Sequence, residues 1–266
     1  MEFEVKDLAK IKFYLDLQLE HLPSSILVHQ SAYVQKILEK FNMDKSYPSK
    51  TPMVVRSLDI EKDPFRPCGG EKILGPKVPY LSAIGALMYL ANCTRPDIAF
   101  AMNLLARHSA APTKRHWTDV KDVLRYLDGT KDLGLYFEIN QDPTITGYTD
   151  ACYLSDPHNA RSQTCFVFLY GGIAISWKSS KQTLVATSTN HSEIIALHEA
   201  SRECVWLRRM INHIEQSCDL GSIESPTIIY KYNSACVTQI QTCYIKSNLI
   251  KHIAHELFYP HELQQW

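Results

Sequence analysis

The segment Thr146-Gly147-Tyr148-Thr149-Asp150-Ala151 ends a short apolar stretch with a carboxylate and predicts a β-strand. A second carboxylate follows in Ser192-Glu193-Ile194-Ile195-Ala196-Leu197, at the first turn of a long helical pattern. We take Asp150 and Glu193 as the candidate functional residues, because the hairpin-rich segment between them can bring a strand end and a helix start together. The simpler interpretation is that Asp150 caps a turn and Glu193 interacts with the helix dipole.

The composition is that of an ordinary globular protein. The chain has 266 residues, of which 45% are hydrophobic and 21% are charged, which is enough for two domains. The formal net charge is +0. No strong overall field therefore recruits nucleic acid, and a nucleic-acid-binding protein of this composition would need a local basic patch.

The eight cysteines form no Cys-x-x-Cys pair, which excludes the usual zinc and redox motifs. We expect buried free thiols in a reducing compartment. The acidic start Met1-Glu2-Phe3-Glu4 is unlike a signal peptide. No apolar run approaches the roughly 20 residues of a membrane span. We therefore expect an intracellular protein, cytoplasmic or nuclear, without a membrane partner.

The N-terminal half predicts short strands followed by helices. Residues 3–20 and 26–29 predict two strands, and Ser31 begins an amphipathic helix. Residues 46–79, rich in proline, glycine and charge, predict an extended loop. The remaining elements are a helical region broken at Arg95-Pro96-Asp97, a third helix and a short strand, at residues 82–108, 116–127 and 134–137.

The C-terminal half predicts a mixed sheet with helices on its faces. Asn140–Pro143 is the expected domain boundary, and Gly171-Gly172 predicts a tight hairpin turn. Strands are expected at residues 145–150, 164–170, 173–178 and, short and buried, 227–230, with 184–187 as the candidate for another. Helices are expected at residues 190–213, 234–241 and 252–264. Glu193 falls on the inward stripe of the first helix, where the dipole would keep it ionised. The fold class is therefore α/β, of the mixed α+β kind.

Several blocks of the sequence resemble copia-type retrotransposon Pol polyproteins, in the same order and over nearly the whole chain. The blocks similar to the ribonuclease H region of that family are residues 147–151, 156–162, 175–179, 187–193 and 199–207. Residues 6–8 and 13–15 resemble the end of the reverse-transcriptase palm. Residues 80–87 and 94–99 resemble its thumb and connection.

The resemblance implies an organisation and an activity. Residues 1–45 would be a remnant of the palm end and thumb start, 46–79 an extended loop, 80–140 a helical thumb and connection, and 141–266 a ribonuclease H-like domain. The family domain hydrolyses the RNA strand of an RNA–DNA hybrid with Mg²⁺, so an RNA–DNA hybrid or other nucleic acid is the expected partner. The polymerase motif of the family is Tyr-x-Asp-Asp. No Asp-Asp pair occurs in this chain, so we expect no reverse-transcriptase active site.

The same resemblance implies four acidic metal ligands. Asp150 and Glu193 match the first two and are the expected catalytic and metal-binding residues. Tyr232 stands at the position of the third acid and Ala254 at that of the fourth. Some relatives also lack the fourth acid, so Tyr232 is the weightier loss.

These substitutions predict an impaired site. Two Mg²⁺ ions about 4 Å apart flank the scissile phosphate in this mechanism. Four carboxylates nearly balance two dications, whereas two leave about two positive charges uncompensated. Tyrosine, with a reference pKa near 10, is neutral and a poor magnesium ligand. Asp156 or Glu256 could substitute only if placed to within about 0.5 Å.

Other residues also depart from the family or allow two interpretations. Asp16, Cys165 and Cys243 stand where the family usually has glycine, and we expect them to strain turns. Trp177 and Trp206 are expected in the core. His252 is expected at the surface rather than against substrate phosphate. Arg202, Arg208 and Arg209 are expected on a solvated helix face rather than against a nucleic-acid backbone.

Our hypothesis is a degenerate transposon copy with little or no nuclease activity. The alternatives are a non-catalytic nucleic-acid-binding or scaffold module on the same fold, and a relic without function.

Overall fold

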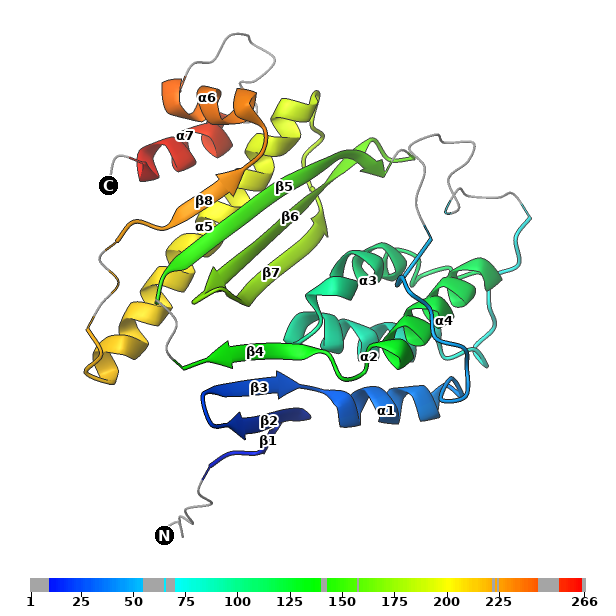
Figure 1. Cartoon of the computed structure of the whole chain (residues 1–266). Helices are drawn as coiled ribbons and strands as arrows, with labels where there is room; N and C mark the ends of the chain where they lie inside the picture. Colours follow the sequence, from blue (N-terminus) through cyan, green and yellow to red (C-terminus); the bar gives the residue numbers. More distant parts are fainter. Residues whose placement is uncertain are drawn as a thin grey trace, which may run out of the picture. The chain divides into compact units, whose positions relative to one another are not determined.

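The computed structural model describes residues 10–54, 65, 70–139, 143–156, 158–221, 223, 225–243 and 254–264. The chain forms two compact units, each with its own four-stranded sheet (Figure 1). Unit 1 comprises Met1–Val54 and Lys72–Gln141, and unit 2 comprises Val55–Glu71 and Asp142–Trp266. The fold class is mixed α/β, as the sequence predicts. Residues 6–8, which resemble the palm, and most of the 140–143 boundary lie outside the described residues.

The sheet of unit 1 is antiparallel, in the order β1-β2-β3-β4. Its strands are β1 (Phe13–Tyr14), β2 (Leu17–Leu22), β3 (Ser25–His29) and β4 (Gly134–Glu138). One strand is expected over residues 3–20, whereas the described part, from residue 10 onward, contains a hairpin that turns at Leu15 and Asp16. Their φ angles are 48° and 60°. Two positive φ angles suit the twist of a tight hairpin but are costly for non-glycine residues, so the expectation of a strained turn at Asp16 is confirmed.

The helices of unit 1 bury the apolar stripes that the sequence indicates. They are α1 (Ser31–Lys40), α2 (Tyr80–Cys93), the 3-10 helix η1 (Pro96–Ile98), α3 (Ala99–Ala106) and α4 (Lys114–Gly129). Thr113 and His116 form a reciprocal capping box at the start of α4. The most deeply buried apolar residues include Leu38, Leu87, Ile98, Leu105 and Leu124. In the described part of the 46–79 loop, the only regular pairing is a bridge from Ile73 to Thr113.

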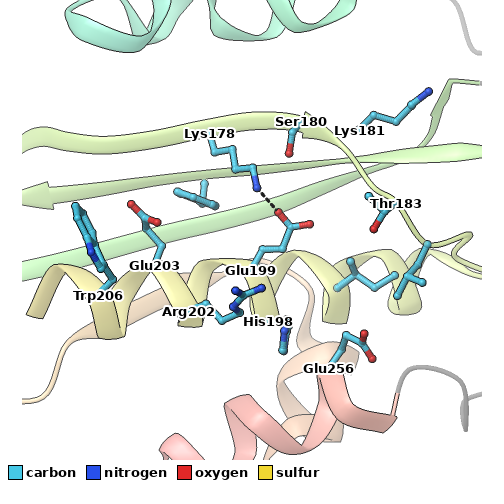
Figure 2. A pocket seen from close by; sticks show the side chains of 13 residues that line it. Lys178, Ser180, Lys181, Thr183, His198, Glu199, Arg202, Glu203, Trp206 and Glu256 are labelled. Carbon is cyan, nitrogen blue, oxygen red and sulfur yellow. Dashed lines mark hydrogen bonds and ion pairs between the residues drawn. The ribbon is translucent and has the colours of Figure 1, made fainter. Parts of the chain in front are cut away.

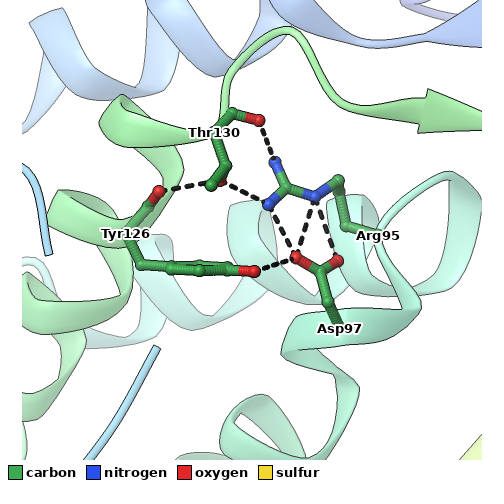
Figure 3. Close-up of polar contacts among 4 residues, drawn as sticks. All are labelled: Arg95, Asp97, Tyr126 and Thr130. Atoms are coloured by element: carbon green, nitrogen blue, oxygen red, sulfur yellow. Dashed lines mark hydrogen bonds and ion pairs between the residues drawn. The ribbon is translucent and has the colours of Figure 1, made fainter. Parts of the chain in front are cut away.

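The predicted helix break at Arg95-Pro96-Asp97 is confirmed, and Arg95 fastens it to the end of α4 (Figure 3). The Arg95 guanidinium donates to the Asp97 carboxylate at 2.7 and 3.0 Å and to the Thr130 carbonyl oxygen at 3.0 Å. Tyr126 donates its hydroxyl to the same carboxylate at 2.8 Å. Burial acts to raise the pKa of Asp97, but the hydrogen bonds and charge of Arg95 outweigh it and lower the pKa.

We expect Arg95→Met to lower the free energy of unfolding by about 2 kcal/mol, because it removes the buried guanidinium that donates to the Asp97 carboxylate and to Thr130. The lowered pKa of Asp97 stabilises the fold above its unfolded value of about 3.9, and this stabilisation is lost as the pH falls through the folded value. Urea titrations from neutral to acid pH should therefore show a smaller acid loss for the variant. Arg125→Met, at the more exposed pair with Asp122, is the control and should cost less than about 1 kcal/mol. Equal losses of unfolding free energy in the two variants would contradict a stabilising role for the Arg95–Asp97 pair.

The sheet of unit 2 is mixed, in the order β7-β6-β5-β8. The strands are β5 (Ile145–Asp156), β6 (Arg161–Tyr170), β7 (Ile173–Lys181) and β8 (Ile228–Lys231). The first three are antiparallel neighbours, and β8 pairs in parallel with β5. The predicted turn at Gly171 and Gly172 is confirmed, with φ angles of 56° and 80°. A register shift between Cys152 and Asp156 carries β5 beyond its expected end at Asp150.

The long helix α5 (Thr189–Ser217) packs on this sheet. Its apolar residues Ala200, Cys204 and Leu207 join a cluster with Phe166 and Phe168 of β6. Close packing requires the glycine of the Thr146–Ala151 segment, because a Cβ on Gly147 would lie 2.5 Å from the Phe168 ring. The Thr146–Ala151 segment therefore contributes both the close packing at Gly147 and the carboxylate of Asp150.

Two short helices complete unit 2: α6 (Ser234–Thr242) and α7 (Ala254–Leu263). They pack against the N-terminal part of α5 through a second apolar cluster. This cluster contains Ile194, Ile195, Leu197, Cys236, Ile240 and Leu257. The helix expected over residues 252–264 is described from Ala254 onward, and His252 lies outside the described residues.

Two expectations for unit 2 are wrong. Residues 184–187 form no strand, because polar side chains fold this segment into the approach to α5. Gln182 donates to the Ser192 carbonyl oxygen at 2.8 Å, and Ser188 caps the helix. Strand β8 is not buried, since Ile228 and Tyr230 are more than half exposed. It lies at the edge of the sheet and has one neighbouring strand among the described residues.

The cysteines at expected glycine positions differ from each other. Cys243 ends α6 with a φ of 49°, so the expectation of strain is confirmed there. Cys165 lies within β6, paired with Asp150, so the expectation of a strained turn is wrong for it. In the described part of the chain, no helix is long and apolar enough to cross a membrane.

We therefore expect opposite effects from two glycine substitutions. Cys243→Gly should raise the free energy of unfolding by about 1 kcal/mol by relieving a left-handed residue. Cys165→Gly should lower it by about 1 kcal/mol, since glycine weakens a strand interior. Urea unfolding of both variants under reducing conditions measures the difference, and effects of the same sign would refute this account.

Candidate functional site

The site is built where β5 and β8 run side by side. Thr149 of β5 is in register with Lys231 of β8, and the next residues along the two parallel strands are Asp150 and Tyr232. The side chain of Asp150 is exposed within an alternating strand whose neighbour Thr149 is buried. The topology thus brings position 232 beside Asp150.

Glu193 approaches from α5. The helix begins at Thr189 after the Ser188 cap, so Glu193 is its fifth residue and lies just beyond the first turn expected for it. Its side chain is buried. Burial raises the pKa of Glu193, Lys231 opposes this, and the neighbouring Asp150 carboxyl adds to it. The helix dipole therefore does not dominate, and the net shift of the pKa is upward rather than toward the ionised form.

The closest partner of Glu193 is a lysine that sequence reasoning missed. The Lys231 ammonium donates a hydrogen bond to Glu193 Oε2, and the two side chains are only 2% and 7% exposed. A lysine at a strand end, directly before the tyrosine in the acid position, was the available signal. The structure thus brings together Asp150, Glu193 and Lys231.

Two thiols lie next to Asp150. Cys165 is its register partner on β6, and Cys152 follows two residues later on β5. A hydrogen bond from the Cys152 thiol lowers the pKa of Cys165 to about 7, against the effect of burial. The same bond, with burial, raises the pKa of Cys152. The sequence indicated buried thiols, whereas Cys152 is exposed.

The two positions without acids contribute nothing to the carboxylate pair. Tyr232 is fully exposed, and Ala254 begins α7 with a methyl side chain. Asp156 lies six residues beyond Asp150 on β5, about 15–20 Å away, and is bonded by Asn159. Glu256 acts on the pKa of His198, not on that of Glu193. Neither therefore stands in for a missing acid.

The donor set does not suit two Mg²⁺ ions, which prefer charged oxygen ligands in octahedral geometry. Asp150 and Glu193 supply two carboxylates, and Lys231 already engages one of them. Within the residues that the structure describes, no group of three or more His, Cys, Asp or Glu side chains could hold a metal ion.

A separate groove of about 760 Å³ lies between β7 and α5, and neither Asp150 nor Glu193 lines it (Figure 2). Lys178 crosses it to Glu199 at 2.8 Å. Trp206 lines it with half of its surface exposed, so its expected place in the core is wrong. Arg202, on the same helix, is exposed as expected, whereas Arg208 anchors the segment after α5 by donating to the carbonyl oxygens of residues 223 and 225.

The sequence is similar to known transposon proteins. It is 39% identical over 230 residues to the retrovirus-related Pol polyprotein from transposon TNT 1-94 of Nicotiana tabacum, covering 86% of this chain and 17% of that protein. It is 29% identical over 254 residues to the Pol polyprotein from transposon RE2 of Arabidopsis thaliana, covering 95% of this chain and 16% of that protein. The chain thus spans less than a fifth of both polyproteins. No family model and no solved structure matches it.

A further relative is similar in extent to this chain. The uncharacterized mitochondrial protein AtMg00810 of Arabidopsis thaliana is 30% identical over 207 residues, covering 77% of this chain and 81% of that protein. The chain belongs to the copia-type retrotransposon Pol polyproteins. The family that the sequence motifs indicate is therefore confirmed, and the chain is a transposon-derived Pol fragment.

We expect iodoacetamide to alkylate Cys165 with a pH midpoint near 7, because the thiolate is the reactive form. Cys152→Ala removes the donor and should move this midpoint upward. Peptide mass spectrometry after timed labelling across a pH series measures both. An unchanged midpoint in Cys152→Ala would rule out the hydrogen bond as its cause.

Proposed function

We propose that residues 141–266 form a ribonuclease H-like domain whose hydrolysis of RNA–DNA hybrids is impaired. The main support is the convergence on one site of the first three acidic positions of the family. Asp150 lies on β5, position 232 directly follows the end of the neighbouring strand β8, and Glu193 reaches Asp150 from α5. Mg²⁺ is the metal that such a site would use, and an RNA–DNA hybrid is its substrate.

The impairment follows from charge and placement. In the proposed site, Tyr232 and Ala254 supply no negative charge, and Lys231 neutralises part of what remains. Two-metal hydrolysis needs ligands on both cations to position the attacking and leaving oxygens. With two carboxylates and one ammonium, the site lacks the charge to hold two dications.

A second candidate function is hybrid or single-strand binding without cleavage. Tyr148 and Tyr230 stack on the exposed face of β5 and β8, with ring centroids 5.2 Å apart, and Tyr232 is exposed nearby. Exposed aromatic rings can stack on bases without sequence preference. This arrangement favours binding over a role as an inert scaffold.

We expect the natural chain to leave a labelled RNA–DNA hybrid uncut in Mg²⁺ or Mn²⁺, at the level of an Asp150→Asn control. Lys231→Met with Tyr232→Asp and Ala254→Asp restores the acids and frees Glu193, and should gain metal-dependent cleavage of the RNA strand only. Adding Asp150→Asn to this triple variant should abolish the gain. Denaturing gels with single-stranded RNA and double-stranded DNA as further substrates measure the specificity.

The proposal fails if the triple variant keeps the cooperative melt of the natural chain, binds the hybrid and still cuts nothing. Hybrid binding by the natural chain that weakens with salt, and drops in Tyr148→Ala, would favour the second candidate function.

A further inference from the structure

The buried contact between Lys231 and Glu193 differs from the Lys178–Glu199 pair, which also reaches α5. Lys231 is the last residue of β8, and its side chain turns inward to place an ammonium on Glu193. At 2% exposure it is cut off from solvent, and lysine is almost never buried so completely without a partner. The cation therefore belongs to the packed interior rather than to the surface.

This ammonium lies against Glu193, one of the two carboxylates that would hold a metal in the proposed site. Lys231 donates to the Glu193 carboxylate, and the charges of both Lys231 and the neighbouring Asp150 act on it. Two carboxylates and one ammonium leave a net charge of −1 when all three are ionised. An arriving dication would meet a fixed positive charge within contact distance of its own ligand, and their repulsion is strong where water is excluded.

We propose that the Lys231 ammonium acts as a built-in cation that keeps Glu193 paired in the folded protein and excludes divalent metal from it. This inference rests on the proposed function for its assignment of the site as the metal position of a nuclease. The missing acids weaken metal binding by omission, whereas Lys231 opposes it directly. It also removes the need for metal, because a buried carboxylate otherwise costs stability.

Lys178 and Glu199 provide a matched comparison. Their pair also joins a strand of this sheet to α5, at 2.8 Å, but the side chains are 46% and 24% exposed. Solvent and salt screen such a pair, and its contribution to stability is small. Burial is the property in which the two pairs differ most, so Lys178→Met controls for loss of a lysine on the sheet.

The test compares Lys231→Met, Lys178→Met and the natural chain, each at full length, by thermal melting in chelator and in increasing Mn²⁺. In chelator, Lys231→Met should melt well below the other two. Mn²⁺ should raise its melting temperature and leave the others unchanged. The electron paramagnetic resonance signal of free Mn²⁺ should show binding at least about tenfold tighter than in the natural chain, since the opposing charge is gone.

Two results would overturn the inference. The first is equal stabilisation of the natural chain and Lys231→Met by Mn²⁺. The second is a Lys231→Met variant that has the same melting temperature as Lys178→Met and binds no Mn²⁺. If Lys231→Met does not fold, the double variant Glu193→Gln with Lys231→Met, in which both side chains are neutral, tests the inference instead. A folded neutral pair that ignores Mn²⁺ supports the inference, and an unfolded one contradicts it.

The two proposals fail separately. Mn²⁺ binding by Lys231→Met requires no hydrolysis. If it occurs and the acid-restored variant still cuts nothing, the nuclease assignment fails and the cation role of Lys231 stands. If the acid-restored variant cuts RNA while Lys231→Met gains no Mn²⁺ affinity, the reverse holds.

Discussion

The parallel pairing of β8 with β5 is the constraint on which the site depends. It sets Lys231 against Thr149 and so fixes which residues follow at the carboxyl ends of both strands. Because side chains alternate along a strand, a slip of one residue would send Lys231 to the other face and away from Glu193. Phe168 lies against Gly147 and joins the apolar cluster with α5, and this packing fixes the position of α5, which carries Glu193, on the sheet. The register of a four-residue edge strand thus decides the charge of the site.

The local sequence pattern predicts most of the helices and strands. It fails where side-chain hydrogen bonds or packing against distant segments determine the structure. Strands β5, β6 and β7, and the glycine turn between β6 and β7, are predicted by signals that lie within a few residues. The segment at 184–187 has the composition of a strand, yet the hydrogen bonds of Gln182 and Ser188 override it. Trp206 was expected in the core because aromatic residues usually are buried, and only the position of α5 over the sheet shows that it lines a groove.

The candidate site was predictable in its acids but not in its cation. Asp150 and Glu193 stand out by residue type and by motif, and the fold brings them together. Lys231 carries no motif, and its partner lies in another element that only the tertiary fold supplies. The three positions where the family usually has glycine also differ in a way that the sequence does not show. Asp16 and Cys243 occupy left-handed conformations, whereas Cys165 lies in extended strand, a distinction that residue identity cannot reveal.

The pairing of β3 with β4 has a consequence for synthesis on the ribosome. Residues 25–29 meet residues 134–138, so the sheet of unit 1 is completed only after more than a hundred intervening residues have emerged. Until then β3 presents an unpaired edge, the feature by which nascent chains associate wrongly. Such non-local closure also slows folding. The interval during which this edge is open, rather than the final stability of unit 1, is where a chaperone would have the most to protect.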